Sequence, residues 1–296
     1  NNPNISNILP DYSSNKKMNR RQHNIFKTSS FLNIMKLVDI HAHLEHKRFA
    51  KDLDKVIKRF EKAGGKFIIN SGVNPETNRK ALVLSEKYNI VKCSFGIYPV
   101  DALAKEIETN QFLRNIQKFE VDEEIKWILE NKDKCVAIGE CGLDYNWITG
   151  KEKEQKAIFQ KVIELAEKLN KPIIIHSRKA EEDAVDILES SKIKKIVMHC
   201  FNGKKGLIKR ARDNGWFFSV PPIITRAHHF KNLVSLVPLP QLLTETDSPY
   251  LSPIPGERNE PKNVAVSVEE IAKIKNLKEE QVADEIFNNA KRLFEL

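Results

Sequence analysis

The feature of this sequence that most limits its fold is a regular alternation between short apolar runs and longer stretches of helical periodicity. The runs predict buried strands over residues 37–41, 66–71, 91–96, 136–139, 173–176, 196–199, 216–220 and 242–245. The other stretches predict helices over 52–62, 75–88, 151–169, 181–190, 205–214, 227–237, 268–275 and 279–294, and the interval 100–133 predicts two more helical segments. Strands joined by helices pair in parallel, because right-handed crossovers return each strand to the same sheet. Eight such units predict a TIM-type (β/α)8 barrel, formed by residues 35–296 as a single domain.

Five of the predicted strands end in side chains that can bind a metal ion. His41 and His43 are two residues apart, so in a strand both imidazoles point to the same face. Four further candidates close apolar runs downstream: Glu140, His176, His199 and Asp247. A doubly wound open sheet would place its site at one switch point, whereas a closed ring brings the ends of strands one, four, five, six and eight together. The pattern therefore favours a barrel with a metal site at the C-terminal ends of its strands.

The candidate ligands indicate the chemistry. A single histidine at a strand end is ordinarily a hydrogen-bonded core or rim residue, but recurrence at several strand ends favours metal binding. Four imidazoles and two carboxylates can hold two divalent ions about 3.5–4 Å apart, bridged by Glu140 or by water. Imidazole and carboxylate donors suit zinc, manganese, iron or nickel, while magnesium prefers carboxylates and water. We expect a metal-bound hydroxide to attack a phosphoryl group, with Asp247 accepting a proton and Glu140 as the second catalytic carboxylate.

Other residues are candidates for substrate contacts. Arg178 follows His176 by two residues, and its guanidinium could bind a phosphate; a salt bridge on the barrel rim is the alternative. Arg258, Asn259 and Glu260 lie in a loop after the last predicted strand, where barrel enzymes place substrate contacts. Asp144 is expected to orient a neighbouring side chain or to cap a turn.

Composition sets weaker limits. No stretch approaches the roughly 20 apolar residues that span a bilayer, so no membrane partner is expected. The formal net charge is +9, but residues 1–36 carry six basic side chains and one acidic one, and the remaining surplus permits a polyanionic substrate without requiring it. The four cysteines form no C-x-x-C pair, which indicates free thiols in a reducing, cytoplasmic compartment. We expect residues 1–34 to be a disordered leader or an appended extension; an organelle-targeting presequence is the alternative.

Six motifs in order resemble those of the TatD family of metal-dependent hydrolases, within the amidohydrolase-like barrels. They run from Met35 to Leu296 and comprise Asp39-x-His41-x-His43, Gly139-Glu140-x-Gly142-Leu143-Asp144-Tyr145, His176-x-Arg178, His199-Cys200-Phe201, Glu245-Thr246-Asp247-Ser248-Pro249-Tyr250 and Arg258-Asn259-Glu260-Pro261.

The resemblance implies a TIM-type barrel with two divalent ions held by the six candidate ligands named above. It further implies phosphodiester hydrolysis, typically as a magnesium- or manganese-dependent DNase with 3′–5′ exonuclease character; zinc is an alternative bound ion. DNA is the implied substrate, with RNA as a second one, and we expect a monomer.

One position departs from the family pattern. Relatives usually carry Gly-x-His-Pro after the third strand, where this chain has Gly96-Ile97-Tyr98-Pro99. A tyrosine donates one hydrogen bond and cannot act as a cationic imidazole. Tyr98 is therefore a candidate substrate contact whose role differs from that of the usual histidine.

Two other functions compete with the nuclease. A small-molecule amidohydrolase or esterase could use the same two metals on a carbonyl centre, but many such relatives bridge their metals through a modified lysine on the fourth strand, where this chain has Glu140. A binding protein with a degenerate site would lack ligands, and all six are present.

Overall fold

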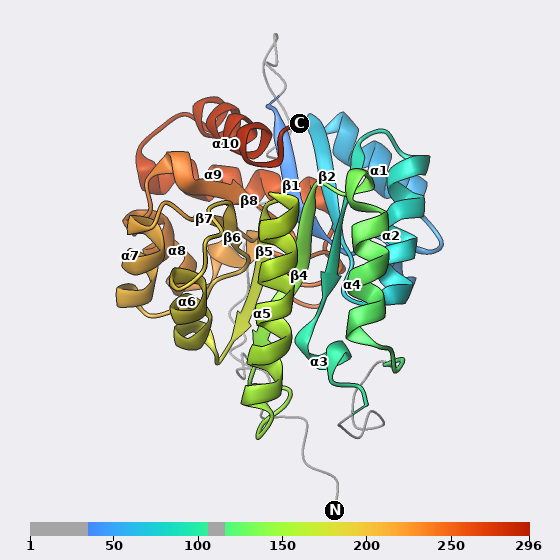
Figure 1. Cartoon of the computed structure of the whole chain (residues 1–296). Coiled ribbons are helices and arrows are strands. Elements are labelled where there is room, and N and C mark those ends of the chain that lie inside the picture. Colours follow the sequence, from blue (N-terminus) through green and yellow to red (C-terminus); the bar gives the residue numbers. More distant parts are fainter. Residues whose placement is uncertain (1–34, 106–115) are drawn as a thin grey trace, which may run out of the picture. The chain divides into compact units, whose positions relative to one another are not determined.

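Eight parallel strands lie side by side in sequence order in a computed structural model that describes residues 35–105 and 116–296. Helices surround the strands on the outside (Figure 1). The expected TIM-type (β/α)8 barrel is thereby confirmed. The strands are β1 (Leu37–Ala42), β2 (Gly65–Ser71), β3 (Val91–Ile97), β4 (Ala137–Asp144), β5 (Ile173–Arg178), β6 (Ile196–Met198), β7 (Phe217–Val220) and β8 (Leu242–Thr244). The expected leader, residues 1–34, lies outside the described residues.

The seam between β8 and β1 is closed by the residues that follow β8. Ala42 and Ser248 form a parallel bridge. The backbone N–H of Asp247 donates to the carbonyl of His41 at 2.8 Å, and the N–H of His43 donates to the carbonyl of Ser248 at 2.8 Å. The segment that carries Asp247 is therefore bonded directly to the strand that carries both histidines.

The helices largely follow the predicted ranges. α2 begins with a capping box between Asn74 and Thr77 and has Pro75 in its first turn, which satisfies free N–H groups there. Within the interval 100–133, two of the helices are α3 and α4, and residues 106–115 of that interval are not described. The helices are α1 (Leu53–Lys62), α2 (Pro75–Lys87), α3 (Pro99–Ala102), α4 (Val121–Glu130), α5 (Glu152–Leu169), α6 (Glu181–Glu189), α7 (Lys205–Asp213), α8 (His228–Leu236), α9 (Val264–Lys275) and α10 (Glu279–Phe294).

Two strands end two or more residues beyond the apolar runs. β4 continues to Asp144 and β5 to Arg178, whereas the runs end at Gly139 and His176. All eight residues of β4 are buried, polar ones included. The apolar run breaks at Glu140 because polar residues of the site alternate there with the buried core residues Cys141 and Leu143.

The strands are buried on both faces, as expected for a parallel sheet covered by helices. The side chains of Ile173, Ile174 and Ile175 are fully buried in succession, which explains why these runs show no alternation between apolar and polar residues. No helix in residues 35–105 and 116–296 is long and apolar enough to cross a membrane.

Candidate metal centre

The six predicted ligands come together at the carboxyl ends of the strands, around Glu140. Its Oε2 lies 3.3 Å from Nε2 of His41 and 3.6 Å from Nε2 of His43. Its Oε1 lies 3.0 Å from Nδ1 of His176 and 3.9 Å from Nε2 of His199. One buried carboxylate therefore presents one oxygen to each of two histidine pairs.

Asp247 completes the group from the segment after β8. Its Oδ1 lies 3.3 Å from Nε2 of His43 and 3.9 Å from Nε2 of His41. The backbone of Asp247 has a φ of 52°, in the left-handed region that is costly for most side chains. The side-chain amide of Asn259, which is buried, donates to the carbonyl of Thr246 at 2.8 Å and supports this bend.

The ring nitrogens of His41 and His43 that face away from the cluster are held by one residue, Ser71 of β2. The Nδ1–H of His43 donates to the carbonyl oxygen of Ser71 at 3.0 Å. The Ser71 hydroxyl lies 3.2 Å from Nδ1 of His41. Both imidazoles are therefore fixed with Nε2 directed at the two carboxylates.

Carboxylates orient the other two imidazoles. The Nε2–H of His176 donates to Oδ2 of Asp144 at 3.0 Å, and Nδ1 of His199 bonds to Oε2 of Glu245. Asp144 Oδ1 also accepts the backbone N–H groups of Asn146 and Trp147, so this residue both orients a candidate ligand and caps a turn. Histidine ligands of metals in proteins usually have such a partner on the second ring nitrogen.

The arrangement of the donor atoms suits binding of a metal ion better than hydrogen bonding among these side chains. Nε2 of His41 is buried and makes no hydrogen bond in the described part of the chain, although Glu140 is close. Buried polar atoms are normally hydrogen-bonded, so this nitrogen indicates a ligand position. Three overlapping triads have donor atoms within 4.8 Å of one another, and they are His41, His43 and Glu140; His41, His199 and Asp247; and Glu140, His176 and His199.

The electrostatics of the centre favour ionised carboxylates. Burial alone would raise the pKa of Glu140, but His176 and His41 hold it well below its usual value. Burial likewise opposes the charged form of His176, yet Asp144 and Glu140 raise its pKa to about 9. The pKa of Asp247 is lowered, despite burial, by His43. Protons and divalent cations thus compete for the same imidazoles.

Tyr98 and Arg178 lie beside the cluster, on the side of β3 and β5. The Tyr98 hydroxyl donates to Oδ2 of Asp144 at 2.8 Å and lies 3.4 Å from Nε2 of His176. Arg178 is exposed at the end of β5, with its guanidinium 5.5 Å from the centre of the Trp147 ring. In the described ranges no carboxylate forms an ion pair with Arg178, so the alternative of a salt bridge on the barrel rim is not found in that part of the chain. The contact of Arg178 with substrate stays a prediction.

Arg258 and Glu260 are instead engaged in ion pairs with α1 and the residue before it. The Arg258 guanidinium binds the two oxygens of Asp52 at 2.7 and 2.8 Å, and Glu260 accepts two bonds from Arg59 at 2.8 and 2.7 Å. These pairs fasten the loop after β8 to α1. The sequence could not show them, because Asp52 and Arg59 lie some 200 residues away. Substrate contacts at Arg258, Asn259 and Glu260 stay a prediction. The ion pairs with Asp52 and Arg59 do not favour it, because they already engage two of the three side chains.

No role was predicted from the sequence for several buried residues that support the candidate ligands. Ser71 carries no signal, because a serine after an apolar run is common. The role of Glu245 could have been predicted, since it precedes Asp247 by two residues in the same motif. Asp39 is fully buried and accepts from the N–H of Thr246 at 2.9 Å; burial raises its pKa well above the usual value.

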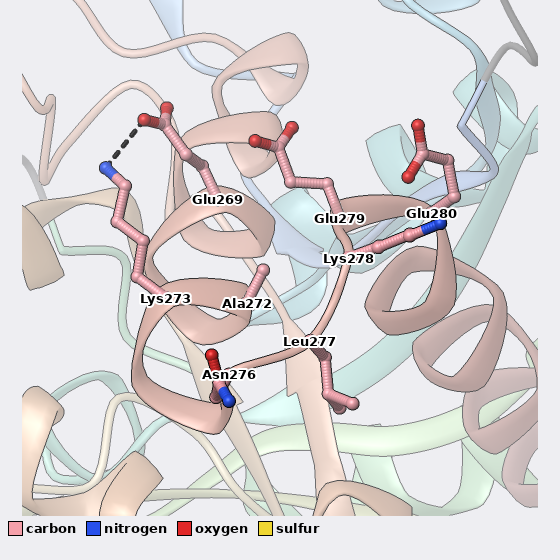
Figure 2. Close-up of a pocket in the computed structure, with 8 residues that line it drawn as sticks. All are labelled: Glu269, Ala272, Lys273, Asn276, Leu277, Lys278, Glu279 and Glu280. Carbon is pink, nitrogen blue, oxygen red and sulfur yellow. Dashed lines mark hydrogen bonds and ion pairs between the residues drawn. The ribbon is translucent and has the colours of Figure 1, made fainter.

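A surface hollow elsewhere in the structure has none of these features. It lies at the turn between α9 and α10, where Lys273 bonds to Glu269 (Figure 2). Its lining residues are Glu269, Ala272, Lys273, Asn276, Leu277, Lys278, Glu279 and Glu280. None of them is a candidate ligand, so the hollow is separate from the metal centre.

Comparison with known proteins identifies the family. The pattern of the family described as TatD related DNase matches residues 38–295. An uncharacterized metal-dependent hydrolase of Methanocaldococcus jannaschii is 38% identical over 88% of this chain and 97% of its own length. The deoxyribonuclease TATDN3 of Homo sapiens is 35% identical over 87% of this chain and 94% of its own. A 3′-5′ ssDNA/RNA exonuclease TatD of Erwinia tasmaniensis is 32% identical over 88% of this chain and 100% of its own.

A solved structure agrees with this assignment. The TatD homologue YJJV of Escherichia coli superposes with a TM-score of 0.77 at 25% identity, covering 89% of this chain and 99% of that one. The expectation of a metal-dependent hydrolase is therefore confirmed at the level of the family. With three triads of side chains that could hold a metal ion at the carboxyl ends of a (β/α)8 barrel, this chain belongs to the TatD-related DNase family of metal-dependent hydrolases.

Proposed function

We propose that this protein is a metal-dependent nuclease that hydrolyses phosphodiester bonds of DNA with 3′–5′ exonuclease character, and that RNA is a second substrate. The observation that carries the proposal is the position of Glu140, whose two oxygens face separate histidine pairs. Relatives named as a deoxyribonuclease and as a 3′-5′ ssDNA/RNA exonuclease support it.

Two divalent ions are proposed, one on each side of Glu140. His41, His43 and Asp247 would hold one, and His176 and His199 the other, with Glu140 shared. Magnesium or manganese is the proposed ion in use, and zinc suits the imidazole donors as a bound ion. Such ions activate water and neutralise charge on a phosphoryl group.

The chain's own residues then have distinct tasks. Asp247 faces the histidines through Oδ1 and keeps 19% of its side chain exposed, so it can accept the proton of the attacking water. Arg178 offers an exposed guanidinium near His176, in a position to bind a phosphate oxygen of the substrate. Asp144 and Glu245 keep the imidazoles of His176 and His199 in place during the reaction.

We further propose that residues 35–296 act as one catalytic domain, as a monomer in the cytoplasm. Four free cysteines support a reducing compartment. A small-molecule amidohydrolase or esterase remains the competing function, and the following experiment separates the two.

The test is cleavage of a single-stranded DNA labelled at its 5′ end, with magnesium, manganese or a chelator. The expected result is a metal-dependent ladder that shortens from the 3′ end. Asp247→Asn should abolish it, while the control Asp213→Asn, at an exposed residue paired with Arg212, should cleave like the wild type. No DNA cleavage with any metal, together with hydrolysis of simple carboxylic esters or amides, would replace the nuclease by the small-molecule hydrolase.

A further inference from the structure

Large apolar side chains that are exposed to solvent are few in the described ranges. They are Val83, Trp147, Tyr250, Ile254 and Leu277. The two aromatic ones, Tyr250 and Trp147, lie in the loops that follow β8 and β4. Both loops are at the end of the barrel that carries the ligands, and in a ring of eight strands β4 and β8 stand opposite one another.

Tyr250 lies next to the metal centre. Its backbone N–H donates to the carbonyl of Asp247 at 2.9 Å. Its ring centre is 6.4 Å from that of His43, at an interplanar angle of 69°, and 5.6 Å from that of His46. Even so, the residue is 47% exposed. An aromatic ring that contacts a ligand and yet remains this open adds little to the core and is available to a molecule bound at the centre.

The loop that carries Tyr250 is held from several sides. The carbonyl of Pro249 accepts from the guanidinium of Arg48 at 3.2 Å and from the N–H of Asn259 at 3.2 Å. The carbonyl of Ser252 accepts from Arg226 at 2.8 Å. The ring is therefore presented on a fixed backbone, which lowers the entropy cost of binding. Arg48 and Arg226 also bring positive charge to this loop, which favours binding of a polyanion.

Trp147 and Tyr250 differ in the neighbours of their rings. The guanidinium of Arg178 lies 5.5 Å from its ring centre, so part of that ring already has a cationic partner. In the described ranges Tyr250 has aromatic neighbours only at steep angles, 69° and 71°, and no ring stacked parallel to it.

We propose that Tyr250 is a stacking platform for the nucleobase of a nucleotide adjacent to the scissile phosphodiester. This inference rests on the nuclease function proposed above and adds a recognition element to it. Divalent ions and arginines recognise the phosphate alone, whereas an aromatic ring recognises a base without preference for sequence, because every base has a π face. The site would thus distinguish nucleic acid from other phosphodiesters.

The experiment pairs protein variants with strands that lack a base. Rates are measured for a normal single strand and for strands in which the last or the last-but-one nucleotide carries no base. Tyr250→Leu should lower kcat/KM on the normal strand about 5- to 150-fold, the range that loss of one stacked base produces. On the strand that lacks the stacked base, Tyr250→Leu and the wild type should have the same kcat/KM, because the ring of Tyr250 then has no base to bind. Tyr250→Phe should stay near the wild type, and so should Leu277→Ala, an exposed residue in the hollow of Figure 2.

Metal content per chain is measured on the same proteins. If Tyr250 only covers His43, Tyr250→Leu will lose metal and slow all three strands equally, and the stacking proposal is then wrong. It is also wrong if Tyr250→Leu cleaves the normal strand as fast as the wild type. Failure of the wild type to cleave any strand would overturn the nuclease function itself, and the stacking role with it.

Discussion

At the scale of single residues, the centre is organised by pairs in which one side chain aims another. Ser71, Asp144 and Glu245 each hold a nitrogen that faces outward, and the opposite nitrogen of each ring is thereby directed inward. This arrangement makes the identity of the supporting residues as informative as that of the ligands. Tyr98 belongs to the same supporting layer, because it bonds to Asp144.

We predict that Tyr98→Phe weakens metal binding about 10-fold and Asp144→Asn up to about 100-fold, the range found for residues that orient ligands. The hydroxyl of Tyr98 orients Asp144, and Asp144 in turn orients His176. Loss of the Asp144 carboxylate should therefore perturb His176 more than loss of the Tyr98 hydroxyl. Metal titration monitored by calorimetry measures both affinities. Equal affinities in wild type and Asp144→Asn would show that this carboxylate has no orienting role.

We also predict that metal binding releases protons near neutral pH. The pKa of His176 in the metal-free protein is raised to about 9 by Asp144 and Glu140, against the effect of burial. Below about pH 9 this imidazole is protonated, so a metal ion must displace the proton, and the apparent affinity should rise with pH up to that value. Calorimetry in buffers of different ionisation enthalpy measures the released protons. A binding heat that does not depend on the buffer would contradict the prediction.

At the scale of elements, the loop after β8 connects the centre to the helical layer. Arg258 binds Asp52 through both terminal guanidinium nitrogens and also bonds to Glu260, which in turn binds Arg59. The loop that positions Asp247 and Tyr250 is therefore fastened to α1. A guanidinium with this many partners serves the structure of the loop.

We predict that Arg258→Met lowers the free energy of unfolding at pH 7 by about 1 kcal/mol, the upper range for partly exposed ion pairs. The hydrogen bond from Arg258 lowers the pKa of Asp52 from about 3.8 to about 2. A carboxyl whose pKa is depressed in the folded state stabilises the protein above its unfolded pKa and loses that contribution as pH falls through the folded one. The difference between wild type and variant should therefore be constant above about pH 4 and shrink toward pH 2.

Urea unfolding of both proteins at several pH values tests this prediction. Lys105→Met serves as a control for loss of an exposed cation, paired with Glu120, on another part of the surface. A difference that grows as the pH falls would show that the Asp52 pair is not its source.

The elements also show what the sequence can and cannot predict. Apolar runs located all eight strands, because a strand buried on both faces needs such residues throughout. They placed the end of β4 five residues too early, since Glu140 and Asp144 are polar yet buried. The gathering of the candidate ligands was predictable because they recur at strand ends. The positions of Ser71 and of the partners of Arg258 were not, because their roles arise from contacts between distant segments.

At the scale of the whole molecule, the barrel collects candidate ligands from residues 41 to 247 into one small space. Bringing these charged and polar groups together without a cation costs free energy of folding, because buried imidazoles and carboxylates lose their hydration. A metal ion that binds the folded chain alone would recover part of that cost.

We therefore predict that manganese or zinc raises the melting temperature relative to chelator. An ion at 100 times its dissociation constant adds about 2.7 kcal/mol, which corresponds to roughly 5–10 °C for a domain of this size. Scanning calorimetry with each metal, with calcium as a poorly matched control ion, measures the shift. An identical melting temperature with and without metal would argue against a folded-state metal site.

The number of divalent ions bound per chain tests the central claim most directly. Wild-type protein, Glu140→Gln and the control Glu86→Gln, at an exposed residue paired with Lys134, are equilibrated with manganese, separated from free metal and analysed by mass spectrometry. Two ions in the wild type and the control, and one or none in Glu140→Gln, are the predicted result, because this carboxylate faces both histidine pairs. Equal metal content in all three proteins would contradict a centre built around Glu140.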